Sequence, residues 1–237
     1  MDPAPAGSAR RSLNAQGNMK RLLVLACAVF MAILQPSFAA KRFRVVDGDT
    51  LTLDGETIRL HGIDAPEAGQ TCAAAKGGRW PCGNAAIKAL TLLIGDATPV
   101  CDDRGKDAYG RTLSVCAVRG RDVNRQMVER GAAWAFRRYA DDYAAAEDTA
   151  RAAGRGIWQA PTETAWDYRA HRWAAAAEAA PSDCPIKGNV SGAKRIYHAP
   201  WSPWYDRTRV SPAKGERWFC TEAEALAAGW RAPAWGG

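Results

Sequence analysis

Residues 44–50 have the sequence RVVDGDT, and residues 59–67 follow at short range with RLHGIDAPE. Apolar residues on both sides of the first Asp-Gly pair are typical of two strands joined by a tight turn. A second Asp-Gly pair at residues 54–55 lies between further strand-like residues and predicts another hairpin. Two adjacent hairpins would bring Asp49 and Asp64 together in space.

Acidic side chains gathered in this way repel one another unless a cation lies between them. Asp49 and Asp64 offer carboxylate oxygens, the ligand type that calcium and magnesium prefer, and Glu67 and Arg59 follow close by. The pattern therefore predicts a divalent cation at the two hairpins. Oxygen ligands alone do not separate calcium from magnesium.

The N-terminal residues resemble an export signal. Lys20 and Arg21 precede an apolar run at residues 22–34, and small residues follow up to Ala40. This order predicts a signal peptide within residues 1–40, cut after Ala39 or Ala40, with a buried helix as the alternative. Because the run is too short to span a bilayer comfortably, we expect a secreted or periplasmic protein without a stable membrane anchor.

Charge and cysteine content narrow the function further. The 237-residue chain has a net charge of +7, which would fall to about +4 without the leader. That excludes a clamp that holds nucleic acid by bulk electrostatics, so specific arginines and a metal would have to bind phosphate. Outside the leader the chain has six cysteines, and an even count in an exported protein predicts disulfides.

Six cysteines allow fifteen pairings. Pairing neighbours in the sequence is the simplest hypothesis, with a structural zinc site as the alternative. The three bonds would be Cys72–Cys82, Cys101–Cys116 and Cys184–Cys220.

Apolar spacing and turn residues predict the elements that follow the hairpins. We expect a disulfide-closed loop at residues 68–82, a helix over 84–93, strands at 99–101 and 113–118, and helices over 122–130 and 143–153. Five strands and three helices in this order fit an α+β fold built on the five-stranded oligonucleotide-binding (OB-fold) barrel. The expected divisions are a barrel domain at 41–159, a linker helix at 160–181 and a small C-terminal module at 182–237.

Three motifs resemble the signature blocks of the staphylococcal nuclease (thermonuclease) family. They are VDGDT at residues 46–50, the stretch from Arg59 to Glu67, and YGR at residues 109–111. Their order and spacing agree with that family over residues 42–159. The resemblance implies an OB-fold barrel that acts as an endonuclease on DNA and RNA. It also implies that the enzyme uses Ca²⁺ and leaves 3′-phosphate ends. We expect the protein to be a monomer.

The resemblance also implies a metal-binding set. Asp49 and Asp64 would bind the ion through their carboxylates, and Ala65 would bind it through its backbone carbonyl. A threonine is common in place of Ala65, but only the backbone oxygen would be used there.

Catalytic and substrate-binding roles follow from the same resemblance. Glu67 stands where the family has the residue proposed to deprotonate the attacking water. Arg59 and Arg111 stand at the positions of the two phosphate-binding arginines. Tyr109 and Tyr139 match tyrosines near the nucleotide pocket.

Other functions are compatible with parts of the sequence. The same barrel could be a non-catalytic nucleic-acid-binding module, or the chain could be a cell-envelope interaction protein that works through its C-terminal module. That module could contact nucleic acid or cell wall, or only add stability. The enzyme is favoured because inactive relatives usually lose the carboxylates or the arginines, and here all five positions hold the expected types.

Overall fold

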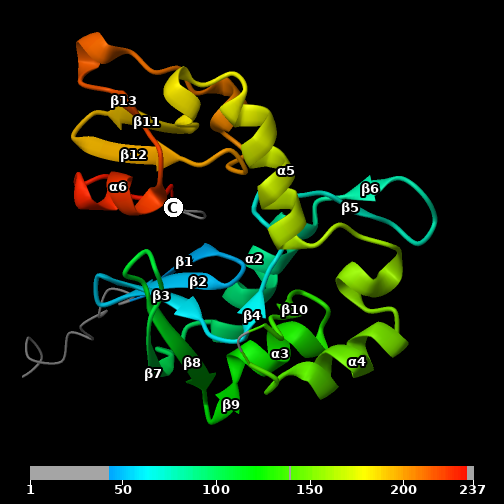
Figure 1. Ribbon diagram of the computed structural model, residues 1–237. Coiled ribbons are helices and arrows are strands. Elements are labelled where there is room, and N and C mark those ends of the chain that lie inside the picture. Colours follow the sequence, from blue (N-terminus) through cyan, green and yellow to red (C-terminus); the bar gives the residue numbers. More distant parts are fainter. Residues whose placement is uncertain (1–42, 139, 234–237) are drawn as a thin grey trace, which may run out of the picture. The chain divides into compact units, whose positions relative to one another are not determined.

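The computed structural model describes residues 43–138 and 140–233, so the expected leader and Tyr139 lie outside the described residues (Figure 1). In chain order the elements are β1 (Phe43–Asp47), β2 (Thr50–Leu53), β3 (Glu56–Leu60), β4 (Ile63–Asp64), β5 (Cys72–Ala73), β6 (Arg79–Trp80), α2 (Cys82–Ile94), β7 (Val100–Lys106), β8 (Thr112–Val118), β9 (Arg121–Asp122), α3 (Val123–Glu129), β10 (Trp134–Ala135), α4 (Ala144–Ala152), α5 (Ala165–Ala177), β11 (Ile186–Ser191), β12 (Lys194–His198), β13 (Arg217–Phe219) and α6 (Glu222–Ala227). Short 3₁₀ helices are η1 (Gly156–Gln159), η2 (Pro181–Asp183), η3 (Tyr205–Arg207) and η4 (Pro212–Lys214).

The two predicted hairpins are confirmed. Strand β1 pairs antiparallel with β2, and β2 pairs antiparallel with β3. Between β2 and β3, Asp54 and Gly55 both have positive φ angles, 51° and 87°, as a two-residue hairpin turn with the right twist requires. Local turn chemistry therefore sets the register that carries Asp49 and Arg59 on neighbouring strands.

The main sheet has the order β1-β2-β3-β8-β7, with β9 paired to β8. Strands β3 and β8 are parallel, whereas the other pairs are antiparallel. Along β8 buried residues alternate with half-buried ones, because successive side chains point to opposite faces of a strand. This arrangement is the predicted OB-fold barrel.

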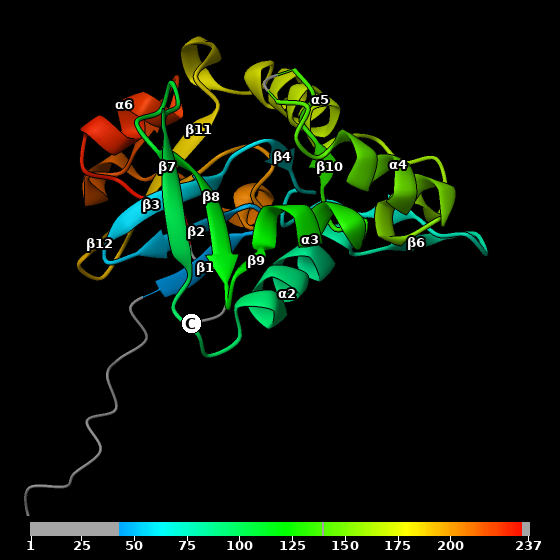
Figure 2. The same cartoon turned by 90° about the horizontal axis from the view of Figure 1, so that it is seen from below.

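Helices α2 and α3 lie side by side against the sheet (Figure 2). Helix α2 buries Ala86, Leu90 and Ile94 at helical spacing and ends at Gly95, which has a positive φ angle of 61°. Asp122 caps α3 by accepting a hydrogen bond from the Arg125 backbone N–H. Both helices agree with the sequence prediction to within one or two residues at their ends.

The structure contains the three predicted disulfides, Cys72–Cys82, Cys101–Cys116 and Cys184–Cys220. Cys101 and Cys116 are direct cross-strand partners of β7 and β8. The expected loop at residues 68–82 differs from the prediction, since it holds the short antiparallel pair β5 and β6. That pairing gives backbone groups beside the first disulfide a hydrogen-bond partner.

The C-terminal residues form a three-stranded antiparallel sheet, in the order β12-β11-β13, that packs with α6. Phe219 and Ile186 are fully buried in its core, where the Trp230 ring meets Phe219 edge to face at 5.3 Å. Thr221 caps α6 by accepting from the Glu224 backbone N–H. Within the described parts of the chain, no helix is both long and apolar enough to cross a membrane.

The surroundings of His198 predict that the C-terminal module loses stability in acid. Burial, together with Lys187 and Arg207, lowers the pKa of His198 to about 4 from its ordinary 6.5. The unfolded chain therefore binds a proton on this side chain at higher pH than the folded chain does, and stability should fall as pH drops from 6.5 towards 4. The difference between pKa values of 6.5 and about 4 corresponds to at most about 3 kcal/mol in the free energy of unfolding.

We expect His198→Gln to reduce this pH dependence by about 2 kcal/mol. The measurement is urea unfolding followed by tryptophan fluorescence at pH 7 and pH 4.5, with exposed His171→Gln as the control. If the wild-type protein and the His198 variant lose the same free energy of unfolding between pH 7 and pH 4.5, this histidine is not the cause of the acid sensitivity.

Candidate active site

One arginine joins the two aspartates that the sequence singled out. From β3, the Arg59 guanidinium donates through Nη1 to Asp49 Oδ1 and through Nη2 to Asp64 Oδ1, both at 2.7 Å. Asp64 is completely buried, and Asp49 is only 4% exposed. The turn before Asp49 needs Gly48, because a Cβ there would lie 2.7 Å from the Ala65 Cβ.

Asp49 is held by two further hydrogen bonds. Its Oδ2 accepts a hydrogen bond from the Ala65 backbone N–H at 2.8 Å, and its Oδ1 accepts one from the Thr50 hydroxyl at 2.9 Å. Ala65, predicted as a metal ligand through its carbonyl, therefore lies beside this carboxylate. Asp49 is fixed in position by strand β2 and the segment after β4.

A second arginine enters the cluster from helix α5. Arg169 Nη1 donates to Asp64 Oδ1 at 3.1 Å and to Glu67 Oε1 at 2.6 Å, and its Nη2 donates to Asp64 Oδ2 at 2.7 Å. Arg169 was not among the site residues predicted from the sequence. Arg169 is more than one hundred positions from its partners in the sequence. It lies three residues after Trp166 and four before Trp173, so the three side chains share one face of a helix. A charged residue between two tryptophans on one helix face was the sequence feature that could have indicated Arg169.

The backbone around Glu67 is tied to several elements. The Gln70 backbone N–H donates to the Glu67 carbonyl at 2.7 Å, and the Gln70 side chain accepts from the Glu67 N–H at 3.1 Å. The same side chain donates to the Glu163 carbonyl just before α5. Glycine is required at position 83, because a Cβ there would lie 1.8 Å from the Glu67 carbonyl oxygen.

The carboxyl groups of the cluster differ in acidity. Burial raises the pKa of Glu67 to about 7, helped by Asp49 and Asp64 and opposed by Arg169. Burial also raises the pKa of Asp47 well above its ordinary value, and Glu67 and Asp49 raise it further. Burial alone would raise the pKa of Asp64 as well. The positive charges and hydrogen bonds of Arg59 and Arg169 have a larger effect, and the pKa of Asp64 therefore lies below its usual range.

Charge and ligand type fit a divalent cation. Asp47, Asp49, Asp64 and Glu67 face two guanidinium groups, so the fully ionised cluster has a net charge of −2. All its acceptor atoms are carboxylate oxygens. Among residues 43–138 and 140–233, however, no three His, Cys, Asp or Glu side chains are arranged as a metal site, since arginines bridge these carboxylates.

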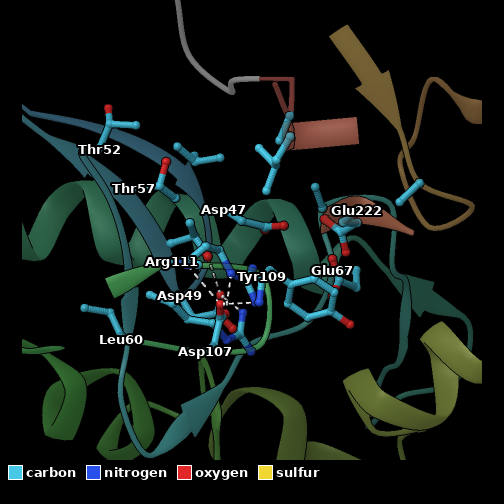
Figure 3. A pocket seen from close by; sticks show the side chains of 18 of the residues that line it. Asp47, Asp49, Thr52, Thr57, Leu60, Glu67, Asp107, Tyr109, Arg111 and Glu222 are labelled. Atoms are coloured by element: carbon cyan, nitrogen blue, oxygen red, sulfur yellow. Dashed lines mark hydrogen bonds and ion pairs between the residues drawn. The ribbon is translucent and has the colours of Figure 1, made fainter. Parts of the chain in front are cut away.

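Asp47, Asp49 and Glu67 lie on the wall of a cavity of about 1410 Å³, which Arg59 and Arg169 also line (Figure 3). Asp64 is buried and does not line this cavity. Arg111 and Tyr109 line the same cavity from the loop between β7 and β8. The hydrogen bond and ring contact that the structure shows for these two residues lie within their own loop. Arg111 Nε donates to Asp107 Oδ2 at 2.6 Å, and the Arg111 guanidinium lies over the Tyr109 ring, 5.2 Å from the centroid. The C-terminal module contributes Tyr197 and Glu222 to the cavity wall, where the tyrosine hydroxyl donates to the glutamate at 2.7 Å.

Asp47 and Asp107 also belong to this region and were not predicted as site residues. Asp47 was interpreted as a turn residue, and it does accept from the Gly48 N–H at 2.7 Å. Asp107 accepts from the backbone N–H groups of Tyr109 and Arg111, both at 2.9 Å, and thereby shapes the loop. Both are aspartates at turns, and their spacing does not distinguish them from ordinary turn residues.

Two family models match the chain. The model described as "Staphylococcal nuclease homologue" matches residues 57–160, which include Arg59, Asp64, Glu67 and Arg111 but not Asp49. The model described as "ArfC" matches residues 167–232, which cover most of α5 and the C-terminal sheet. The second match begins two residues before Arg169.

Similar curated proteins include one named "Succinoglycan biosynthesis protein ExoI" from Rhizobium meliloti (strain 1021). It is 38% identical over 133 residues, which are 54% of this chain and 69% of the relative. An "Uncharacterized endonuclease" of Haemophilus influenzae is 34% identical over 151 residues, 60% of this chain and 79% of the relative. A "Micrococcal nuclease" of Shigella flexneri is 31% identical over 169 residues, 62% of this chain and 91% of the relative. With the OB-fold barrel described above, these matches show that the chain belongs to the staphylococcal nuclease family and is a nuclease.

Proposed function

We propose that this protein is an exported, Ca²⁺-dependent endonuclease that hydrolyses phosphodiester bonds in DNA and RNA and leaves 3′-phosphate ends. The observation that carries the proposal is the buried Asp49–Arg59–Asp64 bridge with Glu67 beside it on a cavity wall. The three disulfides support a chain that folds in an oxidising compartment.

The metal would be held by Asp49 and Asp64, with the backbone carbonyl of Ala65 as a further ligand. A bound divalent ion supplies charge neutralisation at a non-bridging phosphate oxygen and fixes the phosphate in place. The support for this assignment is that the cluster holds four acidic side chains against two guanidinium groups and offers carboxylate oxygens as ligands.

The other side chains have separate tasks. Glu67 would accept the proton of the attacking water at a carboxylate oxygen. Arg59 and Arg111 would donate planar pairs of hydrogen bonds to phosphate oxygens that gain charge as water adds. Tyr109 and Tyr139 would contact the nucleotide, Tyr109 from the cavity wall. The main rearrangement needed is that Arg59 and Arg111 turn from Asp49 and Asp107 towards phosphate.

The proposal is tested with 5′-labelled single-stranded DNA and RNA in the presence of Ca²⁺. We expect fragments of both polymers, and phosphatase treatment should slow their migration because a 3′-phosphate is removed. Products that phosphatase does not shift would contradict the proposed bond cleavage. Binding of both polymers without any fragments would favour the non-catalytic OB-fold module.

Glu67→Ser should lower the rate of hydrolysis by about 10²–10³-fold, because the proposed acceptor of the water proton is lost. The protein should remain folded, as judged by its circular dichroism spectrum. Exposed Glu178→Ser, at the end of α5, is the control and should be as active as the wild-type protein. A rate for Glu67→Ser within threefold of wild type would remove Glu67 from the mechanism.

A further inference from the structure

Arg169 makes three hydrogen bonds to the carboxylates of the cluster, whereas Arg59 makes two. Its guanidinium uses both oxygens of Asp64 and one oxygen of Glu67. Together with Arg59 Nη2, it fills three of the roughly four acceptor positions of the Asp64 carboxylate. A cation on Asp64 would therefore meet a carboxylate whose lone pairs are mostly in use.

The position of Arg169 is set by the packing of α5. Trp166, one turn before it, lies against Trp134 and Phe136 of the barrel, with ring centroids 6.0 and 5.6 Å apart. Arg172, one turn after it, donates through Nε to the Pro200 carbonyl at 2.9 Å. Contacts on both sides thus hold the Arg169 side chain over the cluster, although the side chain itself is long enough to swing away.

We propose that Arg169 competes with the divalent cation for the Asp64 carboxylate and so sets the cation concentration at which the site loads. This inference rests on the proposed function. Two positive charges that share one buried carboxylate repel each other, and the repulsion is large where water is scarce. Without Arg169, four acidic side chains would face Arg59 alone, and the cluster would attract a cation more strongly.

The test is calorimetric titration of the purified protein with Ca²⁺ alone. Arg169→Gln should bind Ca²⁺ at least ten-fold more tightly than the wild-type protein, and Arg169→Lys should fall between them. The control is Arg121→Gln, which removes an exposed arginine of β9 that does not line the cavity, and its affinity should equal wild type. Equal or weaker binding by Arg169→Gln would overturn the proposal.

Thermal unfolding is a second measurement, and it remains informative if Arg169→Gln is unstable without metal. The melting temperature of Arg169→Gln should be lower than wild type in EGTA, since buried carboxylates lose a partner, and Ca²⁺ should raise it more than it raises wild type. Equal Ca²⁺-induced shifts would contradict competition. If the wild-type protein binds Ca²⁺ and cleaves nucleic acid but Arg169→Gln binds Ca²⁺ no more tightly, only the inference about Arg169 fails. If the wild-type protein neither binds Ca²⁺ nor cleaves nucleic acid, the proposed function fails.

Discussion

Asp64→Asn should reduce hydrolysis of single-stranded DNA by about 10³-fold or more. Asp64 accepts hydrogen bonds from both Arg59 and Arg169, and it is fully buried. The amide keeps the shape but loses the charge that both guanidinium groups and a divalent cation would need. Steady-state cleavage of a labelled oligonucleotide measures the loss.

The same substitution should also destabilise the protein by about 3 kcal/mol, because removing one partner of a buried ion pair leaves the others without compensation. Urea unfolding measures this effect separately. Asp142→Asn, at an exposed position before α4, is the control for both measurements. Cleavage by the Asp64 variant within threefold of wild type, at equal folded fraction, would show that the cluster is not the catalytic site.

Gly83→Ala is expected to damage both stability and activity. A Cβ at this position would lie 1.8 Å from the Glu67 carbonyl oxygen and 2.7 Å from the Glu67 carbonyl carbon. Either α2 or the Glu67 segment must move, at a cost of about 1–3 kcal/mol for an overpacked site. Because Glu67 is displaced with its backbone, the rate should fall by roughly 10²-fold.

Asn84→Ala is the matched control, since it lies next to Gly83 on the exposed side of the same helix. Its stability and rate should stay close to wild type. Thermal unfolding and oligonucleotide cleavage are measured for both variants. A Gly83→Ala protein with unchanged activity would mean that the backbone at Glu67 does not position a catalytic group.

The hairpins, the helix ends and the disulfides could be predicted because local chemistry determines them. Asp54 and Gly55 adopt the positive φ angles that a two-residue turn demands, and Asp122 caps α3 with its own side chain. Cys101 and Cys116 are nearly symmetric about one turn, so strand pairing alone brings them together. In these cases the residues that decide the structure are close in the sequence.

The role of α5 could not be predicted, because it depends on packing between distant segments. Arg169 reaches Asp64 only because Trp166 and Arg172 fix the helix against the barrel and the residues after β12. Likewise, the family resemblance implied a phosphate-binding role for Arg59 but not its contacts within the folded chain, where its two Nη atoms bond to Asp49 and Asp64. A negative cluster attracts the nearest arginines, and spacing alone does not show which ones these are.

The central claim, that this carboxylate and arginine cluster hydrolyses phosphodiester bonds with a divalent cation, is tested by cleavage of a labelled oligonucleotide as Ca²⁺ is removed and restored. The account predicts hydrolysis with Ca²⁺, loss of hydrolysis in EGTA, and recovery when Ca²⁺ is returned. It also predicts that Asp64→Asn remains inactive throughout. Cleavage by purified protein that continues unchanged in EGTA, or no cleavage at any Ca²⁺ concentration, would contradict the claim.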